Sequence, residues 1–301
     1  MIAVMKTLVP DYYESFACTA GKCAHNCCIG WEIDIDEDTE RKYLSWSRNE
    51  ISELSVKLSE KVHYTTRRER RNGAEASFIL DEESGRCPFL NNDNLCEIII
   101  EKGEDALCNI CRDHPRFRNF YDDHIELGLG LTCEAAARLI LTAENSTSYH
   151  WLNSDSAHRI AVPWHQKCID NREIELIPEE EIDWTEWAEV FLSLERLSED
   201  WTEVLDLIRA NADVPCGDIY SNENLHRAFE NLKEYLLFRH FMEYGRDFCE
   251  LLWNLLIKAA AVEKKINGKF TIDDFVDLAR IFSGEIEYSD ENLGLILKEL
   301  E

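Results

Sequence analysis

Cysteine is the residue type whose number and spacing in this sequence point most directly to chemistry. Nine of the twelve cysteines fall before residue 134, in three packages and one single residue. The packages read CTAGKCAHNCC, CPFLNNDNLC and CNIC. The nine residues are Cys18, Cys23, Cys27, Cys28, Cys87, Cys96, Cys108, Cys111 and Cys133. Thiolates are soft ligands, and groups of four suit zinc or an iron–sulfur cluster, so the pattern predicts a metal site.

The spacing of the cysteines within a package determines whether they can bind the same metal ion. Cys108 and Cys111 form a C-x2-C pair, whose two sulfurs can reach one metal from a single turn. Cys27 and Cys28 are adjacent, and because neighbouring side chains diverge, they more easily serve two metals, or one metal and another role. Nine sulfurs are more than two four-ligand sites require, so the set has room for a non-ligand. Zinc and iron fit the spacing equally well.

The alternatives to metal binding are disulfides, buried thiols and a redox-active pair. No targeting segment and no apolar run of roughly 20 residues is visible, which predicts a cytoplasmic protein without a membrane partner. Thiols stay reduced there, which disfavours disulfides. A redox pair at Cys108 and Cys111 would leave the other seven cysteines unexplained. Of the three remaining cysteines, Cys249 lies in an apolar helical pattern and is expected in a core, as are Cys168 and Cys216.

The charge balance limits the classes of binding partner that we expect. The chain has 60 acidic and 32 basic side chains, for a formal net charge of −28. Nucleic-acid binding depends on lysine and arginine to neutralise phosphates, so a nucleic-acid partner is not expected. A basic protein surface rich in lysine is the easier partner, although the same charge also serves solubility.

These residues must be positioned by helices and strands, and the sequence pattern predicts a mainly α fold in two parts. Helical periodicity extends through DWTEWAEVFLSLERLSEDWTEVLDLI, opened by Asp183 and Glu186 as a capping-box-like start. Further helices are expected from Ser221, interrupted at Gly245, and in TIDDFVDLARIF and SDENLGLILKEL. Before residue 150 we expect a helix at 48–61, another at CEAAARLILTAE, and strands at ASFIL and HIELGLGL. The expected division is an irregular cysteine-rich metal-binding domain over 1–150, a connecting segment over 151–182 and an α-helical domain over 183–301.

Four motifs, in order, resemble the flagellin lysine-N-methylase family. They are YYESFACTAGKCAHNCCIGWEIDID, CPFLNNDNLCEI, LCNICRDHPRF and LGLTCEAAARLIL. The similarity covers approximately residues 7–145, and the family is related to cysteine-rich proteins that chelate zinc or iron. The resemblance implies transfer of a methyl group from S-adenosylmethionine to lysine side chains of flagellin, by a protein with a cysteine-bound cluster of the [4Fe-4S] type.

Methyl transfer to an amine needs a neutral lysine, so residues beside the cysteines that can take a proton are catalytic candidates. Tyr13, Asp34 and Asp36 fill this description, with helix capping as the structural alternative for Asp36. Arg112 and Arg116 are candidates for binding the carboxylate of S-adenosylmethionine, with ion pairing to surface acids as the alternative. Two other functions remain open at this point. One is a non-catalytic zinc- or iron-binding module, and the other is a redox iron–sulfur protein.

Overall fold

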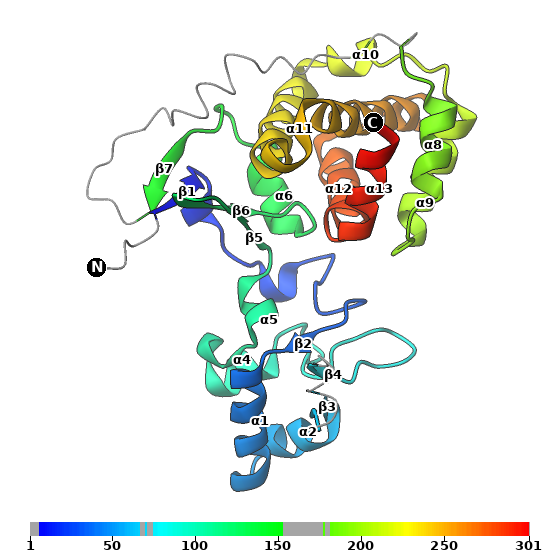
Figure 1. Cartoon of the computed structure of the whole chain (residues 1–301). Helices are drawn as coiled ribbons and strands as arrows, with labels where there is room; N and C mark the ends of the chain where they lie inside the picture. The colour runs from blue at the N-terminus through cyan, green and yellow to red at the C-terminus, as the bar shows by residue number, and fades with distance from the viewer. Residues whose placement is uncertain (1–5, 67–69, 71–74, 153–176, 178–180, 301) are drawn as a thin grey trace. The chain divides into compact units, whose positions relative to one another are not determined.

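The structure, a computed structural model, describes residues 6–66, 70, 75–152, 177 and 181–300. The chain forms two compact units (Figure 1). The cysteine-rich unit consists of Cys18–His114, and the helical unit consists of Met1–Ala17 together with Pro115–Glu301. The cysteine-rich unit is therefore an insertion within the chain of the helical unit.

A four-stranded mixed sheet opens the helical unit. Its strands are β1 (Lys6–Pro10), β5 (Arg116–Phe120), β6 (His124–Leu129) and β7 (Tyr149–Leu152), in the order β5-β6-β1-β7. β1 runs parallel to β6, while β5 and β7 are antiparallel to their neighbours. The register aligns Asn119, Glu126, Leu8 and Trp151 across the four strands. Since aligned residues share a face of the sheet, these four side chains form one row.

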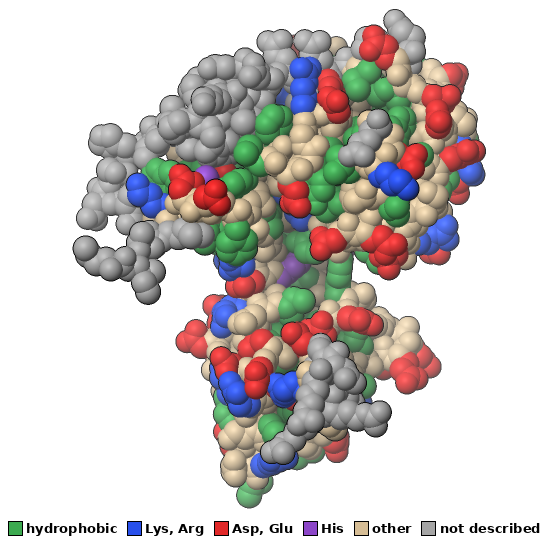
Figure 2. Space-filling model, viewed as in Figure 1, with side chains coloured by type: hydrophobic (Ala, Val, Ile, Leu, Met, Phe, Trp, Pro, Cys, Tyr) green, Lys and Arg blue, Asp and Glu red, His purple; other side chains and the backbone are tan. Residues whose placement is uncertain are grey.

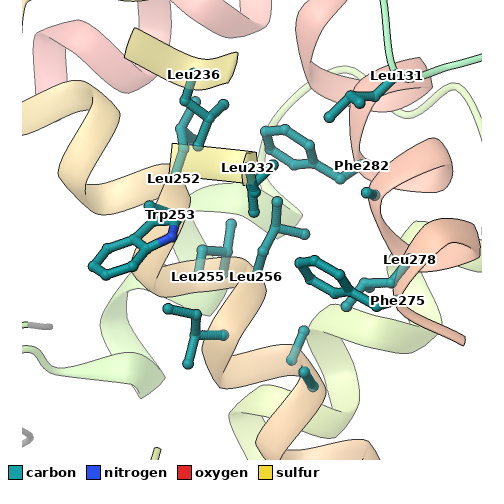
Figure 3. Packing of buried hydrophobic residues seen from close by; sticks show 14 of the residues in the cluster. Leu131, Leu232, Leu236, Leu252, Trp253, Leu255, Leu256, Phe275, Leu278 and Phe282 are labelled. Carbon is teal, nitrogen blue, oxygen red and sulfur yellow. The ribbon is translucent and has the colours of Figure 1, made fainter. Parts of the chain in front are cut away.

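Apart from this sheet, the described part of the helical unit is mainly α-helical. Its elements are η1 (Tyr13–Ser15), α6 (Glu134–Leu141), α8 (Trp184–Leu192), α9 (Glu199–Ala210), α10 (Gly217–Tyr220), α11 (Glu223–Asn267), α12 (Ile272–Phe282), η4 (Ser283–Glu287) and α13 (Asp290–Leu300). Leucine, phenylalanine and tryptophan side chains from α11 and α12 fill the centre (Figure 3). The labelled residues from these two helices are Leu232, Leu236, Leu252, Trp253, Leu255, Leu256, Phe275, Leu278 and Phe282, and Leu131, which follows β6, is labelled as part of the same cluster. Cys216 and Cys249 are buried in this core, as expected, while Cys168 lies outside the described residues.

The helix signals read from the sequence act where they were expected. The carboxylate of Asp183 caps α8 by accepting from the amides of Thr185 and Glu186. Thr271 and Asp274 form a reciprocal capping box at the start of α12. Gly245 interrupts α11 with a φ of 83°, a left-handed conformation that glycine adopts without a steric penalty.

The cysteine-rich unit is smaller and more irregular. It contains η2 (Ala20–Lys22), β2 (Asp34–Ile35), α1 (Glu37–Asn49), α2 (Glu53–Lys61), β3 (Val62–His63), β4 (Ala76–Phe78), α4 (Glu97–Lys102), η3 (Glu104–Ala106) and α5 (Asn109–Asp113). The short strands form a sheet in the order β2-β4-β3. The helix expected over 48–61 is present as α2, which begins only at Glu53 because Ser52 and Ser55 form its capping box. Residues 48 and 49 instead end α1, a helix that was not expected.

A mainly α fold with short strands is confirmed, but the division of the chain differs from the expected one. Residues 115–150 belong to the helical unit rather than to a cysteine-rich domain ending near 150. The physical reason is that β1, β5, β6 and β7 form one sheet and that α6 packs against α11 and α12. Most of the expected connecting segment, 151–182, lies outside the described residues.

The excess of acidic over basic side chains is visible on the surface. Figure 2 shows acidic side chains spread over the visible face, with basic side chains among them. Within the described residues, no helix combines the length and the apolar character needed to cross a bilayer.

Candidate functional site

Backbone hydrogen bonds bring the first two cysteine packages together. The amide of Cys87 donates to the carbonyl of Cys28 at 2.8 Å, and the amide of Gly30 donates to Gly85 at 3.0 Å. Ile29 and Arg86 form the isolated β-bridge between these bonds. The segment after Cys27 therefore pairs with the segment that leads into Cys87, although they are far apart in the sequence.

The second package is a tight loop with a cysteine at each end. Leu90 and Cys96 form a β-bridge, and the amide of Glu97 donates to the carbonyl of Phe89 at 2.8 Å. The guanidinium of Arg86 closes the loop from inside, donating to the carbonyl of Asn91 at 2.5 Å and to Oδ1 of Asn94 at 2.8 Å. The loop thus brings Cys87 and Cys96 close together at the unit's core.

Asp36 fixes the third package. Its Oδ1 caps α1 by accepting from the amide of Thr39, and its Oδ2 accepts from the amide of Asn109 at 2.9 Å. Burial alone would raise the pKa of Asp36, but these amide hydrogen bonds outweigh it and hold the pKa below its ordinary value. Asp36 therefore joins the start of α1 to the start of α5, which carries Cys108 and Cys111 at its first turn.

The assembled thiols lie partly in the core of the unit. Cys87 and Cys108 are buried among its apolar side chains, and Cys28, Cys96 and Cys111 pack against them. Burial raises the pKa of the Cys87 thiol to about 11 and also raises that of Cys96. These values favour neutral thiols in the absence of a positive charge.

Two thiol pairs are in direct contact. A hydrogen bond between Cys111 and Cys108 lowers the pKa of Cys108 and raises that of Cys111. The contact with Cys28, followed by burial, raises the pKa of Cys27 to about 12, whereas a hydrogen bond with His114 acts in the opposite direction. The Nε2 atom of His114 is buried and has no hydrogen-bond partner among the described residues. His114 is not among the residues singled out from the sequence, where its signal is its position three residues after Cys111.

Cys18 and Cys23 stand apart from these thiols in their local contacts. Cys18 is exposed, and its sulfur accepts from the amide of Ala20 at 3.3 Å. The thiol of Cys23 donates to the carbonyl of His25 at 3.2 Å. Cys133 belongs to the helical unit, where its carbonyl accepts from Ala137 at the start of α6. The nine expected ligands therefore do not all belong to one unit.

The side chains as they stand do not fit a bound metal. Across the described ranges, no group of three or more histidine, cysteine, aspartate or glutamate side chains is arranged to hold a metal ion. None of the described cysteines forms a disulfide. The donor chemistry suits zinc or iron, but Cys27 contacts Cys28 and Cys108 contacts Cys111, so a four-ligand arrangement would require these two pairs to separate.

The candidate catalytic and cofactor-binding residues are also dispersed. Asp34 is exposed on β2, and Asp36 has the capping role described above. Tyr13 lies in the helical unit, where its hydroxyl accepts a hydrogen bond from Nε of Arg116 at 3.0 Å. Arg112 belongs to the cysteine-rich unit and donates to Asn109. The two arginines therefore belong to different units, and the structure assigns Asp36 a positioning role.

The chain is similar to three curated proteins. It is 27% identical over 161 residues to the flagellar biosynthetic protein FliU of Salmonella muenchen, which covers 52% of this chain and 90% of that protein. It is 27% identical over 132 residues to the lysine-N-methylases of Salmonella typhimurium and Salmonella choleraesuis, which covers 44% of this chain and 31% of each of those proteins.

These matches confirm the resemblance to flagellin lysine-N-methylases that the four motifs predicted. The matched segment spans about a third of the length of the two lysine-N-methylases. No protein-family model matches the chain, and no solved structure matches it.

Proposed function

We propose that this protein methylates lysine side chains of a protein substrate, with S-adenosylmethionine as the methyl donor and a flagellin-like protein as the acceptor. The observation that carries the proposal is the match to relatives named lysine-N-methylase and flagellar biosynthetic protein. The four ordered cysteine motifs support it, as does a net charge of −28, which favours encounter with a lysine-rich surface.

The proposal includes a metal held by cysteines, with a [4Fe-4S] cluster as the first choice and zinc as the alternative. Eight of the predicted ligands belong to the cysteine-rich unit: Cys18, Cys23, Cys27, Cys28, Cys87, Cys96, Cys108 and Cys111. Cys133, of the helical unit, completes the predicted set. Because no group of side chains in the described residues is arranged to hold a metal ion, we assign the metal no step in the reaction. A metal would displace the thiol protons and join the three packages of a unit whose own core is small.

Methyl incorporation tests the enzymatic part. Purified protein is incubated with S-adenosylmethionine carrying a labelled methyl group and with flagellin that has exposed lysines, and the modified residues are found by mass spectrometry. The control is the same flagellin with its surface lysines replaced by arginine. Label on lysine that is lost in the control supports the proposal. No label on any lysine-bearing substrate overturns it.

Metal and acid-labile sulfide content tests the cofactor part, on protein purified without oxygen. Cys111→Ser removes a thiol of the candidate site, and Cys249→Ser removes a thiol from the helical core as a matched control. We expect iron and sulfide in the natural protein and in Cys249→Ser, and a loss of both in Cys111→Ser. Zinc without sulfide would replace the cluster with a structural ion and would favour a non-catalytic metal module.

A further inference from the structure

Glu126, in the middle of β6, is a carboxylate that the cysteine chemistry does not use. Its side chain is 0% exposed. Side chains alternate along a strand, so Glu126 and His124 lie on the same face of the sheet. The register places Asn119 of β5 on one side of Glu126 and Leu8 of β1 on the other.

The carboxyl group of Glu126 is only half satisfied. Its Oε2 accepts a hydrogen bond from the hydroxyl of Tyr121 at 3.2 Å. Its Oε1 is buried and accepts no hydrogen bond within the part of the chain that the structure describes. Burial, opposed by Tyr121 and His124, raises the pKa of Glu126 to about 7. A buried carboxylate with an open oxygen is the kind of group that a cationic or proton-donating ligand would complete.

A chain of ionisable groups leads from Glu126 towards solvent. Oε1 of Glu126 lies 3.6 Å from Nε2 of His124, slightly beyond hydrogen-bonding distance, and such contacts often shorten when a substrate binds. Nδ1 of His124 lies 2.7 Å from Oδ1 of Asp123, whose side chain is 89% exposed. Glu126, His124 and Asp123 therefore form a route from a fully buried carboxyl group to bulk water.

The surroundings of this route suit an alkylammonium group. The rings of Tyr121 and His124 stack at 4.6 Å, and the ring of Trp151 meets His124 edge-on at 5.7 Å. The ammonium group of Lys6 lies over the ring of Trp151, 5.6 Å from its centroid. Aromatic faces attract cations, and the position of Lys6 over Trp151 shows that an ammonium group is accommodated beside these rings.

We propose that Glu126 accepts the proton of the acceptor lysine, and that His124 passes this proton to Asp123 and solvent. This inference rests on the proposed function and adds the residues that prepare the nucleophile. The ammonium N–H bond breaks, its electron pair stays on the lysine nitrogen, and the proton forms an O–H bond with Oε1 of Glu126. His124 then takes the proton at Nε2 and releases the other proton from Nδ1. The lysine nitrogen is left neutral, with the lone pair that attack on a methyl group requires.

Among the residues that the structure describes, several titratable groups lie near Glu126 and contribute to the expected pH dependence. These groups are Tyr121 from the β5–β6 turn, His124 on β6, Asp123 beyond it, and Lys6 on β1, whose Cα pairs with that of His124. Because Glu126 must be ionised to accept a proton, kcat/KM for the lysine substrate should rise with pH through about 7.

The kinetic test compares three variants. Glu126→Gln keeps the shape of the side chain but cannot accept a proton, and should lower kcat roughly 100-fold or more. His124→Gln should lower kcat less and change the pH profile, because His124 acts through Glu126. Asp122→Asn, which removes the neighbouring acid of the same turn, is the matched control and should leave kcat unchanged. Unchanged kcat and an unchanged pH profile in Glu126→Gln would overturn the inference.

A second measurement needs no methyl transfer and so separates this inference from the proposed function. The probe is Nα-acetyl-lysine amide, titrated into protein with 13C-labelled glutamate carboxyl groups and followed by NMR at pH 8. We expect a shift of the Glu126 carboxyl signal on titration, and a loss of probe binding in Glu126→Gln. If the natural protein transfers no methyl group but this shift is present, the proposed function fails and the lysine site stands. If Glu126→Gln binds the probe as well as the natural protein does, the site fails.

Discussion

Glu126 and Glu287, two fully buried carboxylates of the helical unit, have opposite electrostatic surroundings. Glu287 ends η4, where its carboxylate accepts from Tyr235 at 2.8 Å, from His240 at 2.7 Å and from Arg239 at 3.2 Å. Burial would raise the pKa of Glu287, but the charge of Arg239 and the hydrogen bond from His240 lower it to about 2. Burial outweighs the contacts of Glu126 with Tyr121, His124 and Asn119, and its pKa rises to about 7.

Burial alone therefore does not decide whether a carboxylate is ionised. Its hydrogen-bond donors and charged neighbours decide it. The Glu287 network is complete, since Arg239 also donates to the main-chain carbonyl of Glu287 at 2.9 Å. A complete network of this kind ties α11 to η4 and has no open position for a ligand. The open oxygen of Glu126 is the feature that separates a candidate site from a structural ion pair.

The largest expected effect comes from breaking the complete network. Arg239→Leu leaves Glu287 as a buried charge without its ion-pair partner, and should lower the free energy of unfolding by about 3–5 kcal/mol. Urea denaturation at pH 7 measures this change. The control is Arg138→Leu, which removes an exposed ion pair with Asp273 and should cost no more than about 1 kcal/mol. Equal losses in the two variants would contradict the contrast.

The two carboxylates should also give opposite dependences of stability on pH. The folded pKa of Glu126 is raised above its ordinary 4.5, so its contribution is fully present below pH 4.5 and is lost as pH rises through about 7. The loss corresponds to about 3 kcal/mol, and Glu126→Gln should remove it. The folded pKa of Glu287 is lowered, so its contribution is present above pH 4.5 and is lost as pH falls towards 2.

Denaturation of the natural protein and of Glu126→Gln at pH 5 and pH 8 measures the pH-dependent loss of stability that we assign to Glu126. The variant should be the more stable of the two at pH 8 and close to the natural protein at pH 5. A constant difference between the two proteins at both pH values would mean that Glu126 has no shifted pKa.

Asp36 is an intermediate case, because its partners are backbone amides rather than ions. Asp36→Ala removes the cap of α1 and the acceptor for Asn109, and should lower the free energy of unfolding by about 1–2 kcal/mol. Asp38→Ala, at an exposed acid of the same helix that pairs with Arg41, is the control and should cost less than about 0.5 kcal/mol. Thermal denaturation compares the two, and a larger loss for Asp38→Ala would remove the positioning role of Asp36.

The smallest effect should follow from removing the hydrogen bond that Tyr121 donates to Glu126. Tyr121→Phe deletes a hydrogen bond that lowers the pKa of Glu126, so this pKa should rise above about 7. The corresponding free energy is about 1 kcal/mol, the usual net value of a hydrogen bond. NMR titration of the labelled Glu126 carboxyl group gives the pKa directly. A lower pKa in the variant would show that Tyr121 does not stabilise the ionised form.

Local signals in the sequence predicted much of the helical fold. Asp183 and Thr271 cap helices where their sequence positions indicated, and Gly245 interrupts α11. The assignment of residues 115–150 to the cysteine-rich part failed, because the pairing of β1 with β6 joins segments far apart in the chain. Periodicity within a segment carries no information about which distant segment it pairs with.

The candidate site could be predicted only in part for the same reason. Cysteine spacing identified the three packages, but the contacts that join them run through the main chain of Cys28 and Cys87 and the side chain of Asp36. The sequence HIELGL did contain a signal for the second site, since His124 and Glu126 lie two residues apart and therefore on the same face of an expected strand. What it lacked was the burial that distinguishes Glu126 from an ordinary surface acid.

The insertion of Cys18–His114 between β1 and the other strands of its sheet has a consequence for folding. Lys6 cannot pair with His124 until the whole inserted unit has been synthesised and its two ends have been brought back to the sheet. The entropy cost of closing such a loop grows only with the logarithm of its length, so a long insertion at this point is tolerated thermodynamically. It nevertheless gives the β1–β6 pairing a high contact order, and contacts of this kind form slowly. We therefore expect the β5–β6 hairpin to form first and to act as the template on which β1 docks in a late, rate-limiting step.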